Sequence, residues 1–129
     1  MKKSVIITHG PNGWGGPMEV FPTDKQKYVV SVTGGGIHPL AEQIADLLEV
    51  PTKDGFKEKI EPDEIIIVIV DCGGTLRCGV YPKLGVKTID IHAISPSGPL
   101  SKFMTEDIFV SGTTLEAVSY THLTLPTIA

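Results

Sequence analysis

The run from Ile65 to Val70 limits the fold more than any other stretch of the chain, because all six residues are Ile or Val. A branched apolar run of this length is typical of a strand that is buried on both faces, as in a parallel sheet. Asp71 and Cys72 follow directly. Open α/β sheets place their ligands at the carboxyl ends of such strands. The sequence therefore predicts a parallel sheet with a functional site next to Cys72.

The segment after Asp71 combines the groups that bind a phosphoryl group. It offers a thiol, backbone N–H groups, a hydroxyl and a guanidinium, in the order Cys72, Gly73, Gly74, Thr75, Leu76, Arg77. The glycines permit a tight turn, and the amides and the arginine fork suit phosphate oxygens. The same donors favour a thiolate, which is the nucleophilic form of cysteine. A buried cysteine before an ordinary Gly-Gly turn explains the spacing equally well.

The second thiol, Cys78, forms a Cys-x5-Cys pattern with Cys72. This spacing is neither the Cys-x-x-Cys redox motif nor a usual zinc pair, and the chain has only two cysteines. Structural zinc would need two more ligands, of which His92 could be one. No metal and no cofactor are therefore expected. A disulfide is not expected without a secretion signal, and Cys78 is interpreted as a small, partly buried residue that closes the loop.

The remaining pattern favours an α/β fold. An amphipathic helix is predicted from Ile37 to Val50, with Pro39 in its first turn and Pro51 preventing its continuation. Strands are predicted over residues 4–9, 27–32, 65–70, 87–93 and 107–110, and a short helix over 100–104. This order predicts a small single-domain α/β sandwich with a mixed, partly parallel sheet and one main helix.

Composition and charge exclude several classes of protein. With 129 residues, 41% hydrophobic and 20% charged, the chain is expected to form one soluble globular domain. A net charge of −4 and the absence of a Lys/Arg-rich run argue against a nucleic-acid partner. No apolar run approaches the roughly 18 residues of a membrane helix, and no signal peptide is recognised. A cytoplasmic setting is expected.

Several other residues allow both a functional and a structural interpretation. His92 ends a predicted strand, and if this strand lies parallel to 65–70, His92 can support a phosphoryl group on Cys72 or remain a hydrogen-bonded structural histidine. Lys83 and Lys87 can offset phosphoryl charge, although solvated lysines are the default expectation. Trp14 is interpreted as a cover over the core. The glycines at 34–36 are interpreted as a plain turn before a helix.

Four separated motifs also carry a resemblance. They are DCGGTLRCG at 71–79 with YPK at 81–83, GWGGP at 13–17, DGFKE at 54–58, and SGPL at 97–100 with EDI at 106–108 and VSG at 110–112. In this order they resemble the glucitol/sorbitol-specific enzyme IIB domain of the bacterial phosphoenolpyruvate-dependent sugar phosphotransferase system. The resemblance runs from the first predicted strand to about Leu115.

The resemblance implies a phosphoryl relay. In that family a phosphohistidine on a IIA protein phosphorylates a IIB cysteine, which passes the phosphoryl group to a polyol imported by the membrane IIC part. It implies phosphotransferase activity, a glucitol-type IIA partner, a IIC subunit or domain, and a location at the inner face of the cell membrane. The family alone does not separate Cys72 from Cys78. Cys72 is chosen because it follows the strand and precedes the glycines.

The end of the chain departs from the family pattern. Residues 1–116 are expected to form the IIB-like domain, and 117–129 are expected to be a non-native tail. A genuine final strand over 119–125 is the alternative. Two other functions also remain open, namely a Cys-dependent phosphatase and a non-catalytic phosphate-binding or redox module that uses Cys72 and Cys78.

Overall fold

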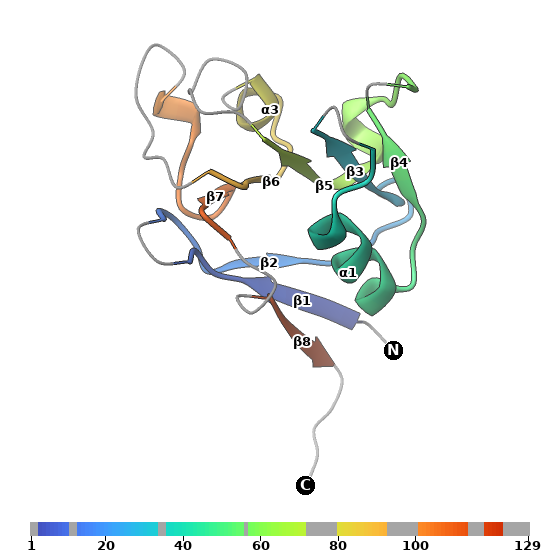
Figure 1. Cartoon of the computed structure of the whole chain (residues 1–129), viewed down its shortest axis with the longest axis horizontal. Coiled ribbons are helices and arrows are strands. Elements are labelled where there is room, and N and C mark those ends of the chain that lie inside the picture. The colour runs from blue at the N-terminus through green and yellow to red at the C-terminus, as the bar shows by residue number, and fades with distance from the viewer. Residues whose placement is uncertain are drawn as a thin grey trace, which may run out of the picture.

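A computed structural model describes residues 3–10, 13–33, 36–55, 57–71, 80–92, 101–113 and 118–122. It contains two sheets and one main helix (Figure 1). The elements are β1 (Lys3–Ile7), β2 (Met18–Val20), β3 (Tyr28–Val32), α1 (Pro39–Leu48), β4 (Thr52–Asp54), η1 (Pro62–Glu64), β5 (Ile65–Val70), α3 (Val80–Lys83), β6 (Thr88–Asp90), η2 (Ser101–Phe103), β7 (Phe109–Ser111) and β8 (Val118–His122).

The larger sheet is parallel and has the strand order β4-β3-β5-β6-β7. The chain runs from β3 through α1 to β4 on one side, and then returns to β5 on the other side of β3. The direction of winding therefore changes between β3 and β5. Doubly wound sheets bind their ligands at such a switch point, outside the carboxyl ends of the strands.

β5 occupies the middle of this sheet because all six of its side chains are buried. Val68 and Val70 pack with Phe109 in one core cluster. Ile67 and Ile69 pack in the other cluster with residues of α1, β1 and β2. A strand buried on both faces needs apolar residues at every position, so the continuous Ile/Val run predicts β5 with its observed bounds.

α1 covers one face of the parallel sheet together with the antiparallel sheet β2-β1-β8 (Figure 1). The buried face of α1 comprises Leu40, Ala41, Ile44, Ala45 and Leu48. The predicted helix is confirmed but is shorter at both ends. His38 is extended and its side chain accepts a hydrogen bond from the Leu40 N–H, and Glu49 adopts a left-handed conformation with a φ of 59°. Both features end helical hydrogen bonding.

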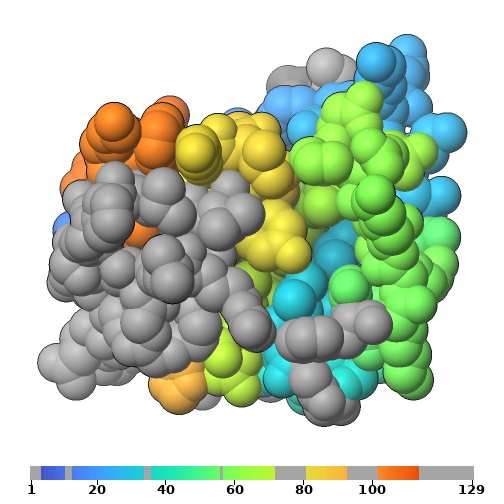
Figure 2. All heavy atoms as spheres, turned by 90° about the horizontal axis from the view of Figure 1, so that it is seen from above, coloured from blue at the N-terminus to red at the C-terminus, as the bar shows by residue number. Residues whose placement is uncertain are grey.

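The opposite face of the parallel sheet carries the short helices α3 and η2. They lie next to one another in Figure 1 and in the view from above in Figure 2, and Lys83 Nζ is 5.9 Å from the centre of the Phe103 ring. Tyr81, Met104 and Phe109 contribute to the core on this side. The parallel sheet is therefore covered on both faces, as its apolar strands require.

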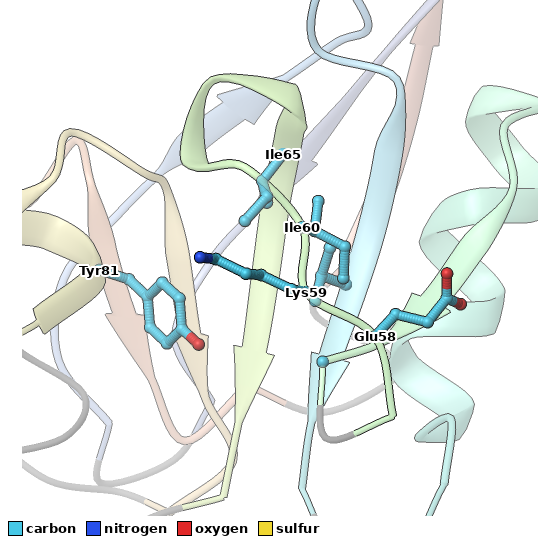
Figure 3. A pocket seen from close by; sticks show the side chains of 7 residues that line it. Glu58, Lys59, Ile60, Ile65 and Tyr81 are labelled. Atoms are coloured by element: carbon cyan, nitrogen blue, oxygen red, sulfur yellow. The ribbon is translucent and has the colours of Figure 1, made fainter.

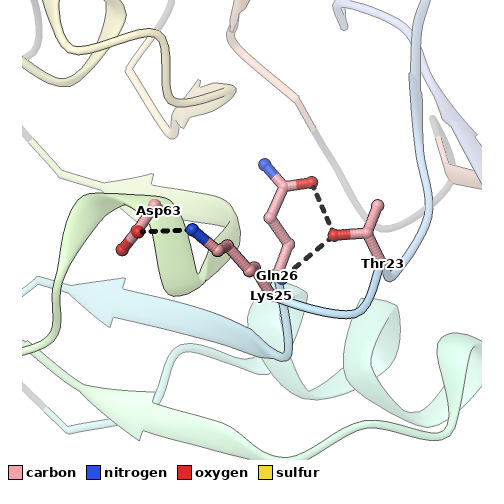
Figure 4. Close-up of polar contacts among 4 residues, drawn as sticks. All are labelled: Thr23, Lys25, Gln26 and Asp63. Carbon is pink, nitrogen blue, oxygen red and sulfur yellow. Dashed lines mark hydrogen bonds and ion pairs between the residues drawn. The ribbon is translucent and has the colours of Figure 1, made fainter.

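The turn before β3 is exposed and polar (Figure 4). Thr23 Oγ1 accepts a hydrogen bond from the Gln26 N–H at 3.0 Å. Lys25 Nζ lies 3.8 Å from Asp63 Oδ2, and both side chains are mostly exposed. An exposed ion pair of this kind contributes little to stability.

The predicted α/β sandwich is confirmed, and its parallel and antiparallel pairings lie in two separate sheets. β2 and β4 were not predicted, because three residues are too few to show a period of two. The strand predicted over 87–93 is shorter and ends at Asp90. The short helix predicted over 100–104 is the 3-10 turn η2.

β8 lies in the segment that was expected to be a non-native tail. It pairs antiparallel with β1, in a register that runs from Lys3 opposite His122 to Ile7 opposite Val118. The alternative of a final strand over 119–125 overlaps with β8, and residues 123–129 lie outside the described residues. The domain boundary at residue 116 and the origin of the tail stay predictions.

Lys87 connects the start of β6 with the end of β2. Its Nζ donates a hydrogen bond to the backbone oxygen of Glu19 at 2.5 Å and lies 5.3 Å from the centre of the Phe21 ring. Burial lowers the pKa of Lys87 below the usual value of 10.5. The side chain is therefore not the solvated lysine that the sequence suggested, because its amino group is partly removed from water.

This lowered pKa predicts a pH-dependent stability. A base whose pKa is lower in the folded state binds fewer protons there than in the unfolded chain, so stability rises with pH across that window. The free energy of unfolding of the wild type is expected to rise, relative to that of Lys87→Met, as the pH increases towards 10.5. Denaturant unfolding at several pH values measures this difference. The control is Lys25→Met, which removes an exposed lysine. If the difference in the free energy of unfolding between the wild type and this control rises with pH in the same way, the assignment to Lys87 is contradicted.

Candidate functional site

The carboxyl ends of four parallel strands form one edge of the main sheet. Their last residues are register partners, with Val32 next to Val70, Val70 next to Asp90, and Asp90 next to Ser111. Asp71 continues from β5 at this edge, and Cys72 is the next residue in the chain. Asp71, the residue before the predicted acceptor, thus leaves the sheet beside the switch point between β3 and β5.

The phosphate-binding loop itself falls outside the described residues. This applies to the predicted nucleophile, to the predicted phosphate-binding residues and to the second thiol, namely Cys72, Gly73, Gly74, Thr75, Leu76, Arg77 and Cys78. Their roles stay predictions. The structure describes the residues on which the loop begins, at Asp71, and those into which it leads, from Val80 onward.

Asp71 and His92 form a close contact at this edge. Nε2 of His92 lies 2.6 Å from Oδ1 of Asp71, and the two side chains are 53% and 41% exposed. The contact follows from the parallel pairing of β5 and β6, which brings residues just beyond the two strand ends together. The structure therefore places His92 beside the residue that precedes Cys72.

The backbone around His92 is fixed by the neighbouring strands. The His92 N–H donates to Oδ1 of Asp90 at 3.0 Å, and the Ile91 N–H donates to the Val70 oxygen at 3.0 Å. The Gly112 N–H lies 2.9 Å from the Asp90 oxygen and 3.1 Å from the His92 oxygen. β5, β6 and the end of β7 thus hold His92 in place. Asp90 was not predicted as a residue of this edge, although a carboxylate inside an apolar strand was a signal for it.

The glycine-rich segment after β1 packs against the end of β7. The Trp14 N–H donates to Ser111 Oγ, and the Ser111 N–H donates to the Trp14 oxygen, both at 2.9 Å. The Trp14 ring lies 6.2 Å from the Phe109 ring and packs against the core, as interpreted from the sequence. Nδ1 of His9 lies 2.8 Å from the Gly15 oxygen. This segment therefore borders the edge that carries His92.

The two candidate lysines have other neighbours in the described residues. Lys83 ends α3 and is exposed beside Phe103. Lys87 lies at the amino end of β6, whereas His92 follows its carboxyl end, and its amino group is bonded to Glu19. The structure thus brings His92 to Asp71 and directs Lys87 elsewhere.

An open cleft of about 170 Å³ lies over β3 and β5 (Figure 3). Figure 3 shows Tyr81 on one side and Ile60 on the other, with the Lys59 side chain extending between them towards Tyr81 and with Ile65 above it. Ile65 begins β5, so part of the cleft lies at the amino end of the strand that Asp71 follows.

Two further findings concern the described ranges alone. No three His, Cys, Asp or Glu side chains come together there in a way that could hold a metal ion. None of the helices in those ranges is long and apolar enough to cross a membrane.

Comparison with known proteins assigns the family. A model of the sorbitol phosphotransferase enzyme II N-terminus matches residues 4–126. The chain is 42% identical over 117 residues to the glucitol/sorbitol-specific EIIB component of the PTS system of Clostridium beijerinckii. That alignment covers 90% of this chain and 35% of the relative, so the chain spans about a third of the relative's length. No solved structure matches. The chain belongs to the family of the sorbitol phosphotransferase enzyme II N-terminus.

Proposed function

We propose that this chain is the phosphoryl carrier of a glucitol/sorbitol phosphotransferase system and that Cys72 is its phosphoryl acceptor. The observation that carries the proposal is the position of Asp71, which leaves β5 at the carboxyl edge of a doubly wound sheet, in contact with His92. Family membership supports the phosphotransferase role. Cys72 is the acceptor in this proposal because it is bonded directly to Asp71, whereas Cys78 lies six residues further along the chain.

The proposed reaction consists of two in-line displacements at phosphorus. The Cys72 thiolate supplies the electron pair of a new S–P bond, and the electron pair of the N–P bond returns to the imidazole of the donor phosphohistidine. A polyol hydroxyl then attacks the same phosphorus and releases its proton to solvent, and the electron pair of the S–P bond returns to sulfur. Backbone N–H groups of Gly73 to Leu76 and the side chains of Thr75 and Arg77 stabilise the charge on the phosphoryl oxygens in both steps.

The proposed partners are a glucitol-type IIA protein as donor and a membrane IIC subunit or domain that presents the polyol. The printed name of the Clostridium beijerinckii relative supports the glucitol/sorbitol class. A IIC partner places the chain at the inner face of the cell membrane. In this proposal the relay needs no cofactor. His92 supports the phosphoryl group, Cys78 closes the loop, and Lys83 contributes positive charge from the end of α3.

Phosphoryl uptake by the whole chain tests the proposal. The chain is incubated with phosphoenolpyruvate, the general phosphotransferase proteins and a glucitol-type IIA, and its intact mass is measured. The expected result is one added phosphoryl group, which is absent when IIA is omitted. No uptake from a IIA protein that phosphorylates its own IIB partner would contradict the proposal. Hydrolysis of an aryl phosphate by the chain alone would favour the phosphatase instead.

A further inference from the structure

We propose that Asp71 is a positioning residue, whose carboxylate orients the His92 ring towards the phosphoryl group on Cys72. This inference rests on the proposed function of Cys72. It starts from the 2.6 Å contact between Oδ1 of Asp71 and Nε2 of His92. Asp71 is joined to Cys72 by one peptide bond, so the ring is held beside the residue that precedes the predicted acceptor.

The chemistry of the contact fixes which ring nitrogen faces Asp71. An ionised carboxylate only accepts hydrogen bonds, so Nε2 carries the proton in this contact. Within the described part of the chain, the hydrogen bonds of His92 are those of Nε2 and of its backbone. Nδ1 is therefore left for a ligand, and the ring is 53% exposed to receive one.

A phosphoryl oxygen also only accepts hydrogen bonds, so Nδ1 must donate to it. Donation from both nitrogens requires a positively charged ring, and a carboxylate at hydrogen-bond distance stabilises that charge. Asp71 thus orients the ring and carries the charge opposite to that of the ring. The hydrogen bond from Nδ1 to the phosphoryl oxygen is charge-assisted, and such bonds are stronger than those between neutral groups.

Hydrogen bonds fix the backbone near His92, but they do not fix the orientation of its ring, and this orientation is the role of Asp71. Hydrogen bonds with residues at the ends of β5, β6 and β7 fix the main chain of Ile91 and His92. Two side-chain torsions of the ring remain to be set. The buried Asp90 uses Oδ1 for the His92 N–H, and His9 on the neighbouring segment is engaged with the Gly15 oxygen. Among the described residues, Asp71 is the carboxylate on the ring.

The arrangement also answers an electrostatic problem. A phosphoryl group adds about −1.5 to −2 charges. A free carboxylate on the preceding residue would repel this charge. In the proposed arrangement the ring donates from both nitrogens, and the positive charge that this requires offsets the Asp71 carboxylate.

The test measures single-turnover phosphoryl uptake from phosphorylated IIA by the whole chain and its variants. Asp71→Ala and His92→Ala are each expected to lower the maximal rate by about tenfold or more, as loss of an orienting partner does elsewhere. The IIA concentration at half-maximal rate is expected to stay unchanged. The double variant is expected to be no slower than the slower single variant, because the two residues act as one unit.

Two further variants separate orientation from charge and from general effects. Asp71→Asn keeps an oxygen that can accept from Nε2 but loses the charge, so its rate is expected to lie between those of the wild type and Asp71→Ala. Asp63→Ala removes an exposed carboxylate just before the other end of β5, and its rate is expected to equal that of the wild type.

The outcomes distinguish the inference from the proposed function. If the wild type takes up no phosphoryl group, the proposed function fails. If the wild type is phosphorylated and Asp71→Ala matches its rate, the positioning role is overturned. It is also overturned if the effects of Asp71→Ala and His92→Ala multiply in the double variant, or if only the half-saturating IIA concentration changes. Should Asp71→Ala unfold, the comparison of Asp71→Asn with His92→Ala decides in the same way.

Discussion

Replacing Cys72 with serine is expected to abolish phosphoryl uptake, whereas Cys78→Ser is expected to keep most of it. A serine hydroxyl is not ionised near neutral pH and is a far weaker nucleophile than a thiolate, so the rate should fall by roughly a thousandfold or more. Cys78 has no such role in the proposed relay. Intact mass after incubation with phosphorylated IIA measures uptake by the two variants and by the wild type.

The same pair of variants also controls for folding. Both substitutions exchange sulfur for oxygen in one loop, so denaturant unfolding of both should have nearly the same midpoint. Loss of uptake with Cys78→Ser and normal uptake with Cys72→Ser would move the acceptor to Cys78 and leave the family assignment intact. Normal uptake by both variants would contradict a cysteine acceptor at either position.

The sequence is sufficient to predict the elements in which burial dictates every side chain. β5 is predicted with its observed bounds because it is buried on both faces. α1 is recognised from its apolar face, although its ends depend on the side chain of His38 and the left-handed backbone of Glu49. β2 and β4 are not predicted, because a strand of three residues is too short to show an alternating apolar pattern. Each of them is defined by its hydrogen-bonded pairing with a neighbouring strand.

The candidate site is predicted only in part, for a related reason. The position of Asp71 directly after the end of β5 follows from the local sequence. The contact between Asp71 and His92 depends on which residues of β5 and β6 lie side by side, and this register is set by the whole sheet. Asp90 and Ser111 stabilise the edge through hydrogen bonds to distant segments, and their spacing along the chain does not reveal those partners.

The glycines of the segment 13–17 illustrate the same limit. Their sequence predicts an irregular loop, but the structure shows why side chains are excluded. Gly15 forms an isolated bridge with Val110, and a Cβ atom on Gly15 would lie 2.2 Å from the Phe109 oxygen. A Cβ atom on Gly13 would lie 2.1 Å from the Ser111 oxygen. The motif is therefore a close backbone contact with β7, beside the edge that holds His92.

Gly15→Ala is expected to destabilise the domain strongly, with a loss of about 3 kcal/mol in the free energy of unfolding. Two effects add. The φ of Gly15 is +92°, which is unfavourable for alanine, and the new methyl group would collide with the Phe109 carbonyl. That carbonyl belongs to β7, which is paired within the parallel sheet, so it cannot move without disturbing the strand. Denaturant unfolding followed by circular dichroism measures the loss.

Gly85→Ala is the matched control, because it isolates the effect of the backbone. Gly85 has a φ of +81°, similar to that of Gly15, but a Cβ atom there would meet nothing within 4 Å. Its loss should be about 1 to 2 kcal/mol, which is the usual cost of a left-handed conformation. Equal losses at the two positions would show that β7 accommodates the methyl group. A much larger loss at Gly15 would show that the glycine-rich segment is held against the end of β7, which supports the backbone of His92.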